Sequence, residues 1–134
     1  VDKVPVSLAL AQAANESAWG TSRFARQGNN IFGQWCYVKG CGLVPRRRLS
    51  GATHEVKKFD SIQESVNAYI NNINTHPSYR FLRELRARMR AQNRPLDSLG
   101  LAVGLGSYSQ RGDNYVDEVQ NLIMQNQLTE RDNR

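Results

Sequence analysis

The stretch "ALAQAANESAWG", residues 9–20, decides the fold, because its alanines predict a helix that packs closely against neighbours on several sides. Pro5 suits the first turn of this helix, and Gly20 breaks the helical pattern. We therefore expect one central helix that begins near Pro5 and runs up to Gly20.

One carboxylate stands in this alanine-rich helix. In a continuous helix Glu16 shares a stripe with Gln12, Ala13, Trp19 and Gly20. Small groups and an indole would then flank the carboxyl, and such an apolar setting favours the protonated form that a general acid needs. The alternative is a helix-end glutamate that forms an ion pair with Arg23 or Arg26.

The rest of the chain predicts three more helices and one irregular excursion. Residues 34–59 are rich in glycine, aromatic and β-branched residues, which is typical of small hairpins or loops. A second helix begins at Asp60 or Ser61, because Ser61 and Glu64 have the spacing of a capping box. A third helix begins at Pro77 and ends before Pro95, with apolar residues inward and its arginines outward.

A leucine-rich segment, residues 96–105, leads to a last helix that Asp113 can cap, and the tail after Gln127 is expected to fray. The predicted fold class is therefore mainly α (α+β). One domain covers residues 1–134, with the excursion 34–59 inserted between the first and second helices. The chain begins "VDKVPVSLAL", without an initiator methionine or leader, so we expect a mature protein or a domain excised from a longer chain.

Composition and charge limit the classes of function. The 134 residues are 40% hydrophobic, and they include no apolar run near the roughly 20 residues of a membrane span. The formal net charge is +6, and the basic residues gather at 46–48 and along the predicted third helix: Arg80, Arg83, Arg86, Arg88, Arg90 and Arg94. This favours an anionic polymer such as nucleic acid, bacterial wall or acidic lipid, or else a solvated helix face.

Four segments in order carry a family resemblance: "QAANESAWG" at 12–20, "NIFG" at 30–33, "VKKFDSIQESVNAYINNI" at 56–73 and "YSQRGDNYVDEV" at 108–119. Together they resemble glycoside hydrolase family 73, the peptidoglycan N-acetylglucosaminidases. Residues 36–48 and 53–61 are most similar to the Bax-type branch of Gram-negative bacteria. A nucleic-acid-binding module would explain the basic charge but neither "NESAWG" nor "NNIFG".

The resemblance implies a lysozyme-like α-lobe with a small β-hairpin lobe. It implies an endo-β-N-acetylglucosaminidase that cuts the β-1,4 bond between N-acetylglucosamine and N-acetylmuramic acid, with Glu16 as general acid. The expected partner is the peptidoglycan glycan strand, and the expected location is the periplasm or cell envelope. We expect a monomer with no metal, cofactor, nucleic acid or membrane span. The alternatives are a muramidase or lytic transglycosylase on the same fold, and a non-catalytic wall-binding domain.

The second catalytic group is open. Family members resembling this chain carry a second glutamate that has no clear counterpart here, and Glu55 is the only acidic residue between Glu16 and Phe59. Glu55 could activate water if the glycines around it let it move toward the cleft, or it could pair in a strand with Lys57 or Arg48. In a third reading the N-acetyl group of the substrate attacks, and Tyr108 steadies the intermediate.

A sugar site needs flat apolar faces and amide groups. The candidates for substrate binding are Trp19, Asn30, Phe32, Gly33, Gln34, Trp35 and Tyr115. Aromatic residues at helical spacing are more often buried. We therefore expect the core to contain about half of the six aromatic residues that could offer such faces, with Trp19 and Tyr115 first: Trp19, Phe32, Trp35, Tyr37, Tyr108 and Tyr115.

The two cysteines, Cys36 and Cys41, are separated by a span that suits a hairpin closed by a disulfide, and an oxidising compartment would favour the bond. A zinc site would need more ligands than these cysteines with His54 and His76 provide.

Overall fold

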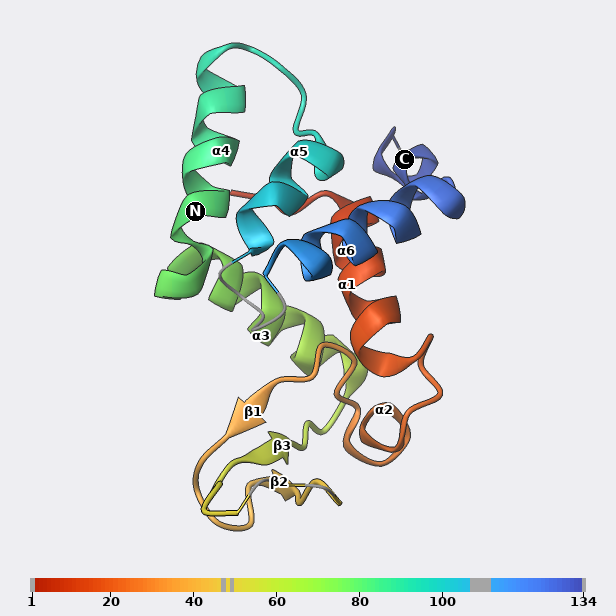
Figure 1. Cartoon of the computed structure of the whole chain (residues 1–134), viewed down its shortest axis with the longest axis vertical. Coiled ribbons are helices and arrows are strands. Elements are labelled where there is room, and N and C mark those ends of the chain that lie inside the picture. Colours follow the sequence, from red (N-terminus) through yellow and green to blue (C-terminus); the bar gives the residue numbers. More distant parts are fainter. Residues whose placement is uncertain (1, 47, 49, 107–111, 134) are drawn as a thin grey trace.

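The structure is a computed structural model that describes residues 2–46, 48, 50–106 and 112–133. Figure 1 shows a group of helices around α1, with the small sheet and α2 at one end of the molecule. The elements are α1 (Val6–Ser17), α2 (Arg23–Gly28), β1 (Trp35–Cys36), β2 (Gly42–Leu43), β3 (Glu55–Lys57), α3 (Ile62–Thr75), η1 (Pro77–Tyr79), α4 (Arg80–Ala91), α5 (Ser98–Ala102), η2 (Val103–Leu105), α6 (Asp113–Gln125) and η3 (Leu128–Asn133).

The prediction of a mainly α fold with a β component is confirmed. Helix α1 is central, because Leu8 and Ala11 are fully buried and α1 packs against α5, α6 and η3. The core continues through apolar residues of α3 to α6, among them Ile73, Leu82, Leu101 and Ile123. No helix in the described part of the chain has both the length and the apolar character to cross a membrane.

The sheet has three short antiparallel strands in the order β1-β3-β2. Val56 of β3 lies opposite Trp35 on one side and opposite Leu43 on the other. The strands β1 and β2 therefore do not pair with each other, and the expected hairpin between them is instead a connection that passes one end of β3. The predicted disulfide between Cys36 and Cys41 closes this connection, with their Cα atoms 6.4 Å apart.

Local signals placed most helices well. Ser61 caps α3 by accepting a hydrogen bond from the backbone N–H of Glu64 at 3.2 Å. Helix α4 follows the single turn that begins at Pro77, and it ends at Ala91, before Pro95. The short helix α2 was not predicted, since the glycines on both sides of it read as breaks. Ser22 caps it through a hydrogen bond from the backbone N–H of Ala25.

The prediction that all arginines of α4 point outward is wrong for Arg86, which is only 4% exposed. Its guanidinium donates to the backbone oxygens of Asp2 and Lys3, and at 2.6 Å to the side-chain oxygen of Asn74. Every acceptor is an oxygen from a distant part of the chain, so Arg86 fixes the N-terminal segment between α3 and α4.

The prediction that the tail frays is also wrong, because the tail forms η3 and packs against α1. Leu128 is buried, and the carboxylate of Asp132 accepts hydrogen bonds from both the backbone N–H and the hydroxyl of Ser7. Ser7 is in the first turn of α1, where backbone N–H groups have no partner within the helix. Pro5, the N-cap residue, provides no side-chain cap. Asp132 therefore caps α1 from the far end of the chain.

Replacing Asp132 with alanine should lower the free energy of unfolding by about 1–3 kcal/mol, because the buried Ser7 groups lose their acceptor. Asp132→Asn should recover part of the loss, since asparagine is also a good cap. Urea denaturation of both variants and of Asp117→Ala, a change at an exposed aspartate of α6, checks this. An Asp132→Ala protein as stable as Asp117→Ala would contradict the capping.

Candidate active site

Glu16 lies in the last turn of α1 and is half-buried. The helix ends directly after it, because Ala18 and Trp19 adopt left-handed backbone conformations with φ of 50° and 57°. The hydroxyl of Ser17 donates to the backbone oxygen of Ala13 and accepts from the backbone N–H of Gly20. The segment "ESAWG" is thus a helix stop that leaves Glu16 at the end of the central helix.

This stop corrects two expectations. The helix does not reach Gly20, so Trp19 does not share a helical stripe with Glu16. Trp19 is also 61% exposed rather than buried in the core. A left-handed conformation costs a non-glycine residue about 1–2 kcal/mol. Two such residues in succession, beside the candidate acid, are the kind of backbone strain found at functional sites.

One helical turn before Glu16, the side chain of Gln12 connects α1 to α3 and α6. It is buried, its amide nitrogen donates to the hydroxyl of Tyr115 at 3.2 Å, and its oxygen accepts from the hydroxyl of Tyr69. Tyr69 in turn stacks on Phe32, with ring centroids 3.9 Å apart. Tyr115 has no exposed surface and Phe32 is buried, so neither presents a face to a ligand in this structure, although both were candidates for substrate binding.

The loop between α2 and β1 is held by Asn30 and Gln34. Asn30 is buried, donates to the backbone oxygens of Gln34 and Lys57 at 2.9 Å, and accepts from the backbone N–H groups of Phe32 and Gln34. The amide of Gln34 donates to the backbone oxygen of Ser65 and accepts from the Ser65 hydroxyl. Asn30 and Gln34 were candidates for binding sugar, but their amides are engaged within the protein.

This loop brings Gly33 against the candidate acid. A Cβ atom at Gly33 would lie 3.2 Å from Oε2 of Glu16, and Gly33 has a φ of +69° that favours glycine. Gly33 therefore leaves room beside the carboxylate that any larger residue would fill. Of the sequence-predicted site residues, Gly33 is thus the one that this loop places beside Glu16, while Asn30, Phe32 and Gln34 contact one another within the loop.

Glu55 is in a different setting from the one expected of a mobile base. It begins β3, is 5% exposed, and accepts hydrogen bonds from the backbone N–H groups of Gly40 and Gly42 at 3.0 and 2.9 Å. These hydrogen bonds lower the pKa of Glu55 below its ordinary value, despite the opposing effect of burial. Glu55 thus holds residues 40 and 42 of the connection that the disulfide closes. Because its pKa is lowered in the folded protein, this stabilisation is fully present at a pH above the ordinary pKa of glutamate, and it is lost as the pH falls below that value.

Two indole rings remain at the surface as possible platforms for a sugar. Trp35 is 55% exposed and stacks on His54, with centroids 3.7 Å apart, and Trp19 is the other. Tyr108 lies outside the described residues. The described residues include no group of three or more His, Cys, Asp or Glu side chains arranged to hold a metal ion.

The sequence did not predict that Ser17 would bond to the backbone of the turn after α1, or that Ser65 would bond to Gln34. It also gave Gln12 no role beyond its place in the motif. A signal existed for Ser17, because a serine directly before a glycine-containing turn can bond to the backbone of that turn. Ser65 had no such signal, since its partner Gln34 lies 31 residues away.

Comparison with known proteins places these residues in a family. The family model for glucosaminidase, described as mannosyl-glycoprotein endo-beta-N-acetylglucosaminidase, matches residues 2–128. A curated relative, Protein bax of Escherichia coli (strain K12), is 38% identical over 115 residues, which is 86% of this chain. The match spans 40% of the length of that relative. No solved structure matches the chain.

The contact between Gly33 and Glu16 predicts a specific effect of Gly33→Ala. The added methyl group should displace the Glu16 carboxylate and lower hydrolysis of glycan strongly, while the left-handed backbone costs about 1–2 kcal/mol of stability. Gly51→Ala is the matched control, because Gly51 has a φ of +81° but no atom within 4 Å of an added Cβ. Thermal melting and turnover of both variants should show similar destabilisation but loss of turnover only for Gly33→Ala. Equal turnover of the two variants would contradict the assignment.

Proposed function

The chain belongs to the glucosaminidase family, a family of glycoside hydrolases, and from this we propose that it cleaves the β-1,4 bond between N-acetylglucosamine and N-acetylmuramic acid in peptidoglycan. The observation that carries the proposal is the half-buried carboxyl of Glu16 at the end of α1, against which Gly33 places no side chain. We further propose that residues 1–134 act as a monomeric domain in the periplasm or cell envelope.

In this proposal Glu16 is the general acid. It donates its proton to the oxygen of the bond that breaks, so that the following sugar leaves as an alcohol while positive charge develops at the anomeric carbon. Two features support the role: the hydrogen bonds of Gln12 fix α1 one turn before Glu16, and Gly33 places no side chain against the carboxylate. The exposed rings of Trp19 and Trp35 are the proposed sugar-contacting surfaces.

The second group is proposed to come from the substrate. The Glu55 carboxylate already accepts two backbone hydrogen bonds and would have to break both to reach a water near the sugar. The N-acetyl oxygen of the substrate can attack the anomeric carbon instead, forming a positively charged oxazolinium ring that keeps its N–H proton, while the leaving oxygen takes the proton of Glu16 and Glu16 becomes a carboxylate. Water then opens the ring and returns a proton to Glu16. Tyr108 remains a proposed partner of this intermediate.

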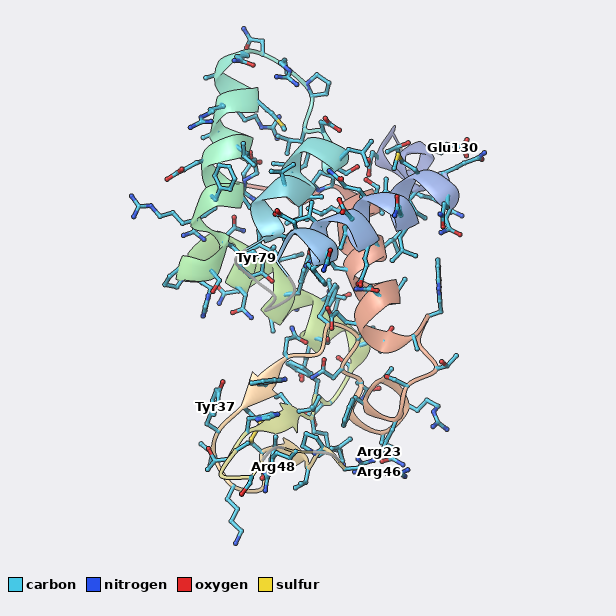
Figure 2. The ribbon with its side chains drawn as sticks, in the orientation of Figure 1. Arg23, Tyr37, Arg46, Arg48, Tyr79 and Glu130 are labelled. Carbon is cyan, nitrogen blue, oxygen red and sulfur yellow. A yellow bond between two sulfur atoms is a disulfide. The ribbon has the colours of Figure 1, made fainter. Side chains whose placement is uncertain are left out.

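Glu16→Gln tests the general acid. It should leave the fold and glycan binding intact and lower hydrolysis of purified sacculi by roughly 10²–10⁴-fold, because glutamine has no proton to give. Glu130→Gln is the matched control, since Glu130 is an exposed glutamate of η3, in the C-terminal segment of the chain (Figure 2). Near-normal turnover of Glu16→Gln would end the proposal.

The same digests identify the bond. Products of the wild-type protein should carry N-acetylglucosamine at their reducing ends. Reducing-end or anhydro N-acetylmuramic acid would instead assign a muramidase or a lytic transglycosylase. Binding to sacculi without any release of fragments would assign a non-catalytic wall-binding domain.

Glu55→Gln separates the two routes for the second step. Below its melting temperature the variant should keep most of its turnover, and a thiazoline analogue of the oxazoline should inhibit both it and the wild type. Its melting temperature should fall, because an amide cannot accept both backbone hydrogen bonds with its two ends. Loss of most turnover in a fully folded Glu55→Gln protein, together with no inhibition by thiazoline, would restore Glu55 as the base.

A further inference from the structure

A basic pocket lies apart from the Glu16 site, between α2 and the segment that follows β2. It is an open depression of about 410 Å³ lined by Arg23, Phe24, Arg26, Pro45 and Arg46. Figure 2 labels Arg23 and Arg46 next to each other at this end of the molecule, one from α2 and one from the segment after β2. The proposed hydrolysis of the glycan gives this pocket no role.

The positive charge of the pocket is not balanced within the described part of the chain. Among the described residues, the ion pairs are those of Arg80 with Glu84 and of Arg90 with Asp2, both outside the pocket. No carboxylate of a described residue lies within ion-pair distance of Arg23, Arg26 or Arg46. On α4, Arg83 and Arg86 donate to oxygens of the protein itself, as Arg23 does in the pocket, whereas no described residue accepts a hydrogen bond from the side chain of Arg26 or Arg46. Three guanidinium groups that share one depression repel one another, and an anion bound between them would relieve that repulsion.

The walls of the pocket are held in place. The guanidinium of Arg23 donates to the backbone oxygen of Val44 at 3.2 Å and to the side chain of Gln27 at 3.3 Å. It also lies 5.6 Å from the centre of the Phe24 ring. Leu43 packs near Gly28, at 3.5 Å from the position of an added Cβ. Helix α2 and the end of β2 are thus joined before any ligand binds.

The lining indicates what kind of anion fits. Guanidinium groups bind carboxylates and phosphates through paired hydrogen bonds, so charge alone does not distinguish them. The ring of Phe24 and the ring of Pro45 add apolar surface, which a peptide with aliphatic side chains can cover and a phosphate polymer cannot. Resting on the proposed function, we propose that this pocket binds the carboxylates of the short acidic peptides that wall glycan strands carry.

The pocket is connected rigidly to the end of α1. Arg23 follows Glu16 by seven residues, and the backbone N–H of Ser22 donates to the backbone oxygen of Ser17 at 3.0 Å across the turn between α1 and α2. A peptide held by Arg26 and Arg46 would therefore fix its glycan strand relative to the helix that carries Glu16. This predicts recognition of peptide-bearing strands mainly through KM.

The test is direct binding of N-acetyl-alanyl-γ-glutamyl-diaminopimelate, measured by calorimetry. The double variant Arg26→Ala/Arg46→Ala should bind this peptide about tenfold more weakly than the wild type, because each exposed arginine contributes a few-fold. The double variant Arg80→Ala/Arg88→Ala, which removes the same charge from α4, should stay within about twofold. Amidation of the carboxylates should weaken binding to the wild type by about tenfold or more. Equal affinity of the two double variants would overturn the proposal.

A glycerol-phosphate oligomer tests the other source of anions. If it binds the wild type as tightly as the peptide does, and loses affinity in Arg26→Ala/Arg46→Ala, the pocket is a phosphate site and the proposal is wrong. Weaker binding of this oligomer than of the peptide supports the proposal.

Hydrolysis separates this proposal from the proposed function. The ratio of kcat/KM on peptide-bearing glycan to kcat/KM on glycan stripped of its peptides should fall about fivefold or more in Arg26→Ala/Arg46→Ala, through KM. An unchanged ratio in an active enzyme overturns the pocket assignment alone. Peptide binding that depends on Arg26 and Arg46, in a protein that hydrolyses no glycan, supports the pocket and overturns the glycosidase alone.

Discussion

The buried amide of Gln12 is the contact on which the rest of the structure depends. The amide donates to the hydroxyl of Tyr115 on α6 and accepts from the hydroxyl of Tyr69 on α3. Both hydrogen bonds form together at only one rotation of α1 about its axis and one position along that axis. Replacing it with an apolar group would remove both hydrogen bonds, at about 0.5–1.5 kcal/mol each. Because Tyr69 also stacks on Phe32, the same contact sets where the loop that contains Gly33 meets α1.

The residues of the family motifs therefore divide into a frame and a site. Gln12, Ser17, Asn30, Phe32 and Gln34 form buried hydrogen bonds or stacking contacts within the protein. What they hold in place is small: a carboxyl group and a glycine beside it. A motif match of this kind predicts a candidate site, but it does not separate the residues proposed to touch a ligand from those that hold the fold around them.

The sequence predicted the elements whose signals are local and missed the contacts whose partners are distant. Ser61 and Pro77 mark the starts of α3 and of the turn before α4 because caps and first-turn prolines act within a few residues. Arg86 and Glu55 bond to backbone groups of remote segments, and a backbone group has no letter in the sequence by which it could be recognised. The motif predicted Glu16 as the general acid, and that role stays a proposal. The position of Trp19 was not predicted, because it depends on a left-handed turn that its residue types disfavour.

The cap that Asp132 provides for α1 has a consequence for the order in which the chain can fold. Asp132 follows Ser7 by 125 residues, so the first turn of the central helix obtains this acceptor only when the end of the domain has been synthesised. The contact is thus among the most non-local that a chain of this length allows, and non-local contacts slow folding because the intervening chain must first be brought together. A shorter chain that ends before Asp132 would have an α1 without this cap. The domain therefore reaches its final stability only when its last residues are in place, rather than element by element.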